Sequence, residues 1–247
     1  MRTIYAGNWK MNKSKEEVIN YVNELKKNDF GTKEVVLFVP SIYLDLVKKE
    51  LEQTNICVGA QNIYQETNGA FTGEISGLML KSMGINKVLI GHSERRQYFN
   101  ENDKNINRKI QIALENDLEA YLCIGETLEE RLANHTNHII EMQVKEALMD
   151  ISEEQMKSIV IAYEPVWAIG TGETATSEQA QEVCNYIREL IKGLYNEEVA
   201  NKTMILYGGS VNNDNCSEIL AKQDINGVLV GGASLDAQGF SNLIIDN

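Results

Sequence analysis

Short apolar runs, rich in β-branched and aromatic residues, recur along the chain, and each is followed by a longer segment of helical periodicity. Runs of this kind predict buried β-strands. They begin near Thr3, Glu34, Ile56, Lys87, Ala120, Ile159, Met204 and Val228. The last run leads into a short predicted helix. The pattern therefore predicts eight strand–helix units.

Three predicted helices begin with a capping box, in which a Ser or Thr and a Glu or Gln three residues later accept hydrogen bonds from each other's backbone N–H. The pairs are Ser14 with Glu17, Thr127 with Glu130, and Thr176 with Gln179. Residues 178–195 form a clearly amphipathic stretch. Each of these helices lies between two predicted strands.

Eight such units in 247 residues match a closed α/β barrel, the (β/α)8 fold, whose active sites lie where the strands end. The two prolines mark no linker, so we expect one domain over residues 1–247. A doubly wound open sheet is the alternative. That fold usually carries a glycine-rich nucleotide-binding turn after its first strand, but here the first strand ends in Gly-Asn-Trp-Lys at residues 7–10.

Charge and composition restrict the classes of binding partner that the sequence can support. A formal net charge of −13 argues against nucleic acid or an anionic membrane. No apolar window approaches membrane-spanning length, and no leader-like run follows the first residues. The cysteines are too far apart for a CxxC motif or a Cys/His cluster: Cys57, Cys123, Cys184 and Cys216. We expect a soluble cytoplasmic protein without a metal site.

The sixth strand ends in a carboxylate that precedes an apolar loop. Pro165 disfavours the helical region for Glu164, so Glu164 closes the strand. Residues 166–169 (Val-Trp-Ala-Ile) are too apolar to rest in water, and glycines at 170 and 172 offer a flexible end. The stretch is either a buried connection or a lid over a ligand. In the second case Glu164 is a candidate catalytic base.

The first strand places two polar groups near the barrel mouth. Side chains alternate along a strand, and small Ala6 with polar Asn8 indicates a face that points into the barrel. Lys10 shares this parity and would project into the mouth. Considered by itself, Lys10 would be interpreted as a solvated residue at a strand end.

The fourth strand adds a histidine. His92 shares parity with Val88 and Ile90, so we expect all three on the interior face. A helix predicted to begin at residues 93–96 would lower the imidazole pKa through its dipole. Considered by itself, His92 would be interpreted as a structural residue with satisfied hydrogen bonds. In a closed barrel, however, four groups meet in one mouth: Asn8, Lys10, His92 and Glu164.

Glycine pairs end the last two strands, as Tyr-Gly-Gly-Ser at 207–210 and Val-Gly-Gly-Ala at 230–233. Barrels commonly hold a phosphate on backbone N–H groups at these two ends. Each pair alone is a tight turn, but two pairs after consecutive strands favour a phosphate site. With Lys10, they would supply local positive potential to an acidic protein.

At these residues the chain resembles the triosephosphate isomerase family. The matching segments run in family order from one end of the chain to the other: residues 7–12, 69–74, 91–96, 123–126, 162–172, 207–211 and 231–235. The lid stretch is the most specific of them. This family is itself a standard example of a Glu base paired with a neutral His beneath a water-excluding loop, so the roles below come from the resemblance.

The resemblance implies a TIM barrel that interconverts D-glyceraldehyde 3-phosphate and dihydroxyacetone phosphate in glycolysis and gluconeogenesis. The reaction would pass through an enediolate, without metal or organic cofactor. Glu164 would move the proton, His92 would polarise and protonate the oxygens, Lys10 would offset negative charge, and Asn8 would help to bind the oxyanion. The phosphate would be held by four residues: Gly170, Ser210, Gly231 and Gly232.

Four further positions take meaning from the resemblance. Cys123 and Glu94 match residues beside the base and the lysine, although a buried thiol and a surface carboxylate are the simpler interpretations. The long 61–76 connection would dock into a second subunit and bring Thr72 to its site, giving a homodimer; taken alone it is a mobile surface loop. Glu173 departs from the family, which usually has Lys in this hinge of the lid.

Three other functions compete with this one. One is another cofactor-free sugar-phosphate isomerase on the same scaffold. Another is a catalytically silent barrel that only binds phosphorylated ligands or protein partners. A Schiff-base aldolase is more distant, because it would want a lysine inside the sixth strand, where this chain has Glu164.

Overall fold

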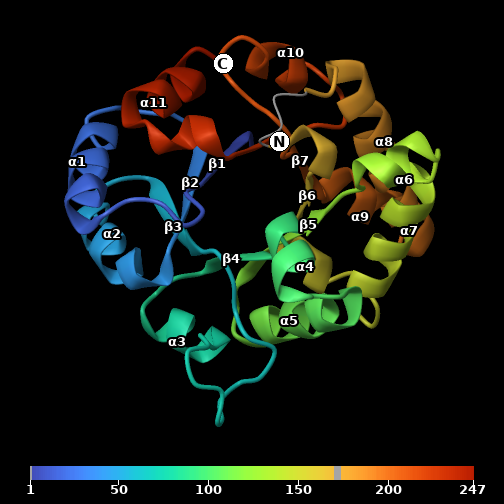
Figure 1. The fold of residues 1–247 in the computed structure, drawn as a ribbon, viewed down its shortest axis with the longest axis horizontal. Coiled ribbons are helices and arrows are strands. Elements are labelled where there is room, and N and C mark those ends of the chain that lie inside the picture. Colours follow the sequence, from blue (N-terminus) through green and yellow to red (C-terminus); the bar gives the residue numbers. More distant parts are fainter. Residues whose placement is uncertain (1, 170–173) are drawn as a thin grey trace.

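Eight parallel strands close into a barrel in the part of the chain that this computed structural model describes, residues 2–169 and 174–247. Neighbours pair in chain order, and β8 returns to pair with β1. Figure 1 shows the ring end-on, with helices outside it. The strands are β1 (Ile4–Asn8), β2 (Glu34–Val39), β3 (Ile56–Ala60), β4 (Lys87–Ile90), β5 (Glu119–Ile124), β6 (Ile159–Tyr163), β7 (Met204–Tyr207) and β8 (Gly227–Val230). The predicted (β/α)8 fold is confirmed, and every predicted strand start lies within one residue of the observed one.

Helices follow every strand and cover the outside of the ring. The α-helices are α1 (Lys15–Leu25), α2 (Leu44–Glu50), α3 (Gly77–Ser82), α4 (Ser93–Phe99), α5 (Asp103–Glu115), α6 (Leu128–Leu132), α7 (Thr136–Ala147), α8 (Ser177–Leu194), α9 (Glu197–Lys202), α10 (Cys216–Leu220) and α11 (Ala237–Ile245). Short 3-10 helices are η1 (Ser41–Tyr43), η2 (Gln155–Ser158), η3 (Val166–Ala168) and η4 (Gly232–Leu235). The three predicted capping boxes begin α1, α6 and α8.

The strands pair unevenly around the ring. Most neighbours are in register over four or five positions. β3 and β4 pair only at Ala60 and Val88, and β7 and β8 only at Tyr207 and Val228. These two seams divide the ring into one set of strands from β8 to β3 and another from β4 to β7.

Apolar side chains form two layers. The inner layer fills the barrel and includes Ile4, Ala6, Val36, Phe38, Leu89, Tyr121, Cys123, Val160, Ala162, Met204, Leu206 and Leu229. The outer layer lies between strands and helices. Ala6 and Ala162 face inward as predicted, but the prediction for β4 is wrong, because Leu89 faces the interior while Val88 and Ile90 join the outer layer.

Gly91 explains why His92 still reaches the mouth. Alternation holds only while the backbone stays extended. Gly91 follows the last residue of β4 and takes a φ of +76°, a left-handed conformation that glycine adopts without steric cost. The chain therefore leaves the alternating pattern between Ile90 and His92.

Charged residues close the opposite, N-terminal end of the barrel. Lys87 Nζ lies 2.8 Å from a carboxylate oxygen of Glu34 and contacts Glu119, while Arg2 Nη1 lies 2.7 Å from the other oxygen of Glu34. Burial disfavours the charged forms, but the opposite charges outweigh it, so the pKa of Lys87 is raised and that of Glu119 lowered. The floor of the barrel is a compensated ionic cluster.

We predict that Lys87→Met destabilises the protein by about 3 kcal/mol, because it removes the buried cation that Glu34 and Glu119 share and leaves these partly buried carboxylates to the more exposed Arg2. Thermal unfolding at neutral pH should show a fall in Tm of at least about 6 °C. Lys145→Met is the control, since Lys145 pairs with Glu141 on the exposed face of α7, and its Tm should barely change. Equal shifts in the two variants would contradict this account.

The same cluster gives a pH dependence. The pKa of Glu119 is lower in the folded protein, so the stability it contributes is present above the ordinary carboxyl pKa of about 4.3 and is lost as the pH falls toward the lowered value. The Tm difference between the native chain and Lys87→Met should therefore shrink as the pH falls below about 4.

Candidate active site

The carboxyl ends of the strands surround a cavity of about 470 Å³. Of the residues predicted to form the site, seven line this cavity: Asn8, Lys10, His92, Glu164, Ser210, Gly231 and Gly232. Asn8 is the last residue of β1, and the others follow the ends of β1, β4, β6, β7 and β8. Gly170 and Glu173 lie outside the described residues.

The loop after β1 fixes Lys10. Lys10 has a φ of +51°, and its N–H donates to Asn8 Oδ1 at 3.0 Å. Gln61 holds the same loop, since its side-chain amide donates to the Lys10 carbonyl at 2.9 Å and to the Phe38 carbonyl at 3.1 Å. Sequence reasoning did not predict this Gln61 clamp. The Lys10 ammonium lies 2.8 Å from Glu94 Oε1, which places Glu94 beside the lysine as predicted.

His92 precedes α4 and caps its first turn. Its Nδ1 accepts the backbone N–H of Glu94 at 3.3 Å, so in the neutral imidazole the proton sits on Nε2. Nε2 lies 3.1 Å from Glu164 Oε1. This geometry aims one N–H of the imidazole into the mouth of the barrel.

The predicted fall in the pKa of His92 is wrong for this arrangement. Burial does disfavour the charged imidazolium, but the Glu164 carboxylate outweighs burial and raises the pKa. The helix dipole is weak beside a carboxylate at hydrogen-bond distance. Protonation of His92 is thus coupled to that of Glu164.

Glu164 is held in a tight, buried environment at the edge of the cavity. It is 3% exposed, and its Oε2 accepts the N–H of Ser93 at 3.4 Å. A Cβ at Gly208 would lie 2.8 Å from Glu164 Cγ, so a larger residue there would displace the carboxylate. Burial disfavours ionisation, but His92 outweighs it and lowers the pKa of Glu164. A buried yet ionised carboxylate is suited to accept a proton.

Cys123 lies on the inner face of β5, within reach of this carboxylate. It is fully buried, and burial together with the charge of Glu164 raises its pKa well above the ordinary value. The thiol is therefore neutral and fills space against Glu164. The structure places Cys123 beside the candidate base, as predicted.

Two short turns form part of the wall of the cavity. Ser210 follows β7, and its carbonyl accepts from the side-chain amide of Asn215 at 3.0 Å. Gly231 and Gly232 lead into η4, where Ser234 Oγ donates to the Gly231 carbonyl at 2.7 Å. Both turns present main chain rather than bulky side chains to the cavity, as an anion site requires.

The first part of the predicted lid is anchored by a buried acid. Glu126 is fully buried and accepts from Trp167 Nε1 at 2.9 Å and from the Tyr163 hydroxyl at 3.1 Å. Arg131 Nη1 lies 3.1 Å from the same carboxylate, and its guanidinium stacks 4.6 Å from the Trp167 ring. No sequence signal assigned Glu126 and Arg131 this role, because the four residues meet only in the folded chain.

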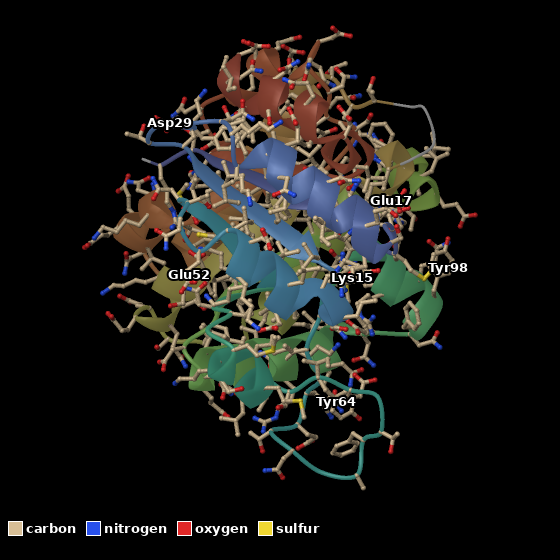
Figure 2. The ribbon with its side chains drawn as sticks, turned by 90° about the vertical axis from the view of Figure 1, so that its left-hand side faces the viewer. Lys15, Glu17, Asp29, Glu52, Tyr64 and Tyr98 are labelled. Atoms are coloured by element: carbon tan, nitrogen blue, oxygen red, sulfur yellow. The ribbon has the colours of Figure 1, made fainter. Side chains whose placement is uncertain are left out.

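The 61–76 connection projects away from the barrel in both views (Figures 1 and 2). Its base is closed by the Tyr64 N–H, which donates to the Ile75 carbonyl at 2.8 Å, and the rings of Tyr64 and Phe71 lie 4.7 Å apart. Thr72 is exposed and does not line the cavity of its own chain. A second hollow of about 420 Å³ lies beside the mouth and is lined by residues that include Met11 and Phe99.

Within residues 2–169 and 174–247, no helix has the length and apolar character needed to cross a membrane. No group of three His, Cys, Asp or Glu side chains in those ranges is arranged to hold a metal ion.

Comparison with known proteins agrees with the geometry. Residues 3–246 match the family described as Triosephosphate isomerase. Three relatives named triosephosphate isomerase align over 98–99% of both chains: that of Clostridium botulinum (strain Loch Maree / Type A3), 50% identical over 246 residues; that of Alkaliphilus metalliredigens, 50% over 244; and that of Finegoldia magna, 47% over 245. The chain belongs to the triosephosphate isomerase family.

Proposed function

We propose that the protein interconverts D-glyceraldehyde 3-phosphate and dihydroxyacetone phosphate by proton transfer through an enediolate. Family membership supports a triose phosphate as substrate, which gives the enzyme a place in glycolysis and gluconeogenesis. The observation that carries the mechanism is the buried pair of Glu164 and His92, 3.1 Å apart in a cavity that Lys10 and two glycine turns also line.

Glu164 serves as the base. Its lowered pKa keeps it ionised in the ligand-free site. Substrate that separates it from His92 leaves burial to raise that pKa, which makes the carboxylate a stronger base. The carboxylate takes a proton from one carbon of the substrate and returns it to the adjacent carbon. The aldose and ketose therefore exchange without any change in composition.

His92 serves as the acid toward the substrate oxygens. Substrate oxygens that enter between the two side chains take over the Nε2–H that now faces Glu164. Separation from the carboxylate removes the influence that raises the imidazole pKa, while the Glu94 N–H still holds Nδ1 as an acceptor. A neutral imidazole then donates to the developing enediolate, with Asn8 as a second ligand of the oxyanion.

Lys10 and the two glycine turns hold the phosphate. The protein as a whole is acidic, so the substrate dianion needs a local positive field. Glu94 fixes the Lys10 ammonium at the rim. Ser210, Gly231 and Gly232 line the same cavity, and a Cβ on Gly231 would lie 3.5 Å from Lys10 Cε, so the lysine and this turn are neighbours. The family resemblance adds Gly170 as a further ligand of the phosphate. The phosphate thus anchors one end of the substrate while the carbonyl end lies at Glu164.

A homodimer completes the proposal. Met11 is 95% exposed and Phe99 62% exposed at the second hollow, and apolar groups gathered in this way favour an interface. The projecting 61–76 loop of a second copy would fill that hollow and bring Thr72 toward the mouth.

Each chain acts as one domain over residues 1–247, and the cytoplasm is the expected compartment.

A barrel that only binds phosphorylated ligands is the competing function. Such a protein gains nothing from a carboxylate that is 3% exposed and costly to bury. Turnover by purified protein separates the two functions directly, because the binding-only protein gives none.

We predict that Glu164→Asp retains the KM for D-glyceraldehyde 3-phosphate but loses about 100-fold in kcat, because a carboxylate withdrawn by one methylene misses its proton. The assay couples product formation to a dehydrogenase in the presence of a chelator, which should leave the native rate unchanged. Glu164→Gln should abolish turnover. Glu189→Asp, on the exposed face of α8, is the control and should behave as the native chain does. A near-normal kcat for Glu164→Asp would rule out this base.

We predict that the native protein has twice the mass of the 27.8 kDa chain in light scattering. Phe71→Asp places a charge on the projecting loop and should shift the mass toward one chain, with a fall in activity. Leu132→Asp changes a residue of α6 that is 74% exposed and should leave the mass as it is. A single-chain mass for the native protein would contradict the dimer.

A further inference from the structure

Lys13 joins two loops that belong to opposite ends of the sequence. It lies between β1 and α1, and its ammonium donates to the carbonyl of Leu235 at 2.6 Å. Leu235 is the last residue of η4 and itself lines the cavity. The bond therefore ties the loop after β1 to the turn after β8.

The Lys13 ammonium also packs against two aromatic rings. Nζ lies 4.5 Å from the centroid of the Tyr21 ring and 5.4 Å from that of Trp9, distances at which a cation is attracted to a ring face. Burial lowers the pKa of Lys13, an effect that Glu17 and Asp236 oppose. A partly dehydrated ammonium makes a stronger hydrogen bond to a carbonyl than a solvated one does.

The backbone at Lys13 is held in an unfavourable conformation. Its φ of +77° lies in the left-handed region, where residues other than glycine meet steric cost. The Tyr43 hydroxyl donates to the Lys13 carbonyl at 3.0 Å, which fixes this conformation from the side of η1. The strain persists because both ends of the residue, carbonyl and ammonium, have partners.

η4 transmits the position of Leu235 to the glycine turn. The helix spans only four residues, and its other end is Gly232 at the cavity wall. Within it, the buried Ser234 hydroxyl donates to the Gly231 carbonyl. A displacement of Leu235 is therefore passed to Gly231 and Gly232 through one short, internally bonded element.

We propose that Lys13 is a positioning residue for the phosphate end of the site, which holds the turn at Gly231 and Gly232 against the loop after β1. The inference rests on the proposed function, because it assigns the phosphate of the substrate to that turn. Lys13 acts through the Leu235 carbonyl and not by contact with the substrate. Its loss weakens binding of the phosphate group more than the proton transfer.

The test compares Lys13→Met with a matched lysine elsewhere. The ammonium of Lys33 contacts the carbonyl of Ile244, lies 3.2 Å from that of Ile245 and 5.8 Å from the Tyr5 ring, so Lys33→Met removes the same kind of contact. Neither Lys33 nor these partners line the cavity. Lys13→Arg keeps the charge and the donor, and Lys13→Gly removes the side chain while easing the left-handed backbone.

The readouts are kcat, the KM for D-glyceraldehyde 3-phosphate and the dissociation constant of inorganic phosphate. Lys13→Met and Lys13→Gly should raise KM and the phosphate constant together by about three- to tenfold, as expected for one lost hydrogen bond, with kcat within about twofold of the native value. Lys13→Arg should restore both constants. Lys33→Met should leave both constants unchanged.

Three results would overturn the inference. The first is that KM and the dissociation constant of inorganic phosphate in both Lys13→Met and Lys13→Gly equal those of the native chain. The second is an equal rise in Lys33→Met. The third is a rise that vanishes in about 0.5 M KCl, because screening at that concentration removes long-range attraction but not a positional change. Native turnover, measured first, decides the proposed function separately, and phosphate binding tests Lys13 whatever that outcome.

Discussion

Closure of a ring of parallel strands is the constraint on which the whole molecule depends. Because all eight strands run the same way, their carboxyl ends meet at one rim. Residues as distant in sequence as Asn8 and Gly231 therefore line one cavity. The following helices also begin at this rim, so the N–H groups of the first turn of α4 reach His92 and Glu164 without any dedicated loop. Figure 2 shows this polarity from the side, with Lys15 and Glu17 at the start of α1 on the same side as Tyr98 of α4, and Asp29 and Glu52 toward the other.

The two ends of the barrel use charge in opposite ways. At the floor, Lys87 and Arg2 are matched by Glu34 and Glu119, so the fields cancel and the cluster serves stability. At the rim, the buried Glu164 carboxylate faces His92, which is charged only when its imidazole is protonated. The floor is satisfied in the absence of any ligand, whereas the rim holds groups whose protonation a ligand changes.

Features encoded by neighbouring residues were predictable from the sequence. The capping boxes of α1, α6 and α8 depend on residues three apart, and the strand starts on local apolar runs. The barrel then followed from counting the units, and Asn8, Lys10, His92 and Glu164 from their places at strand ends. The face of β4 was not predictable by parity, because a single left-handed residue, Gly91, ends the alternation. The pKa of His92, the Gln61 clamp and the Glu126 anchor depend on partners tens of residues away, which no local pattern reveals.

The two thin seams in the strand pairing have a consequence for how a bound ligand and the fold support each other. The seams separate the strands from β8 to β3 from those from β4 to β7. Asn8, Lys10 and Gly231 belong to the first set, whereas His92, Glu164 and Ser210 belong to the second. A molecule that contacts both groups acts as a cross-brace between half-barrels and opposes their separation. Binding of such a molecule would therefore slow the exchange with solvent of the amide hydrogens in the strands that flank the seams.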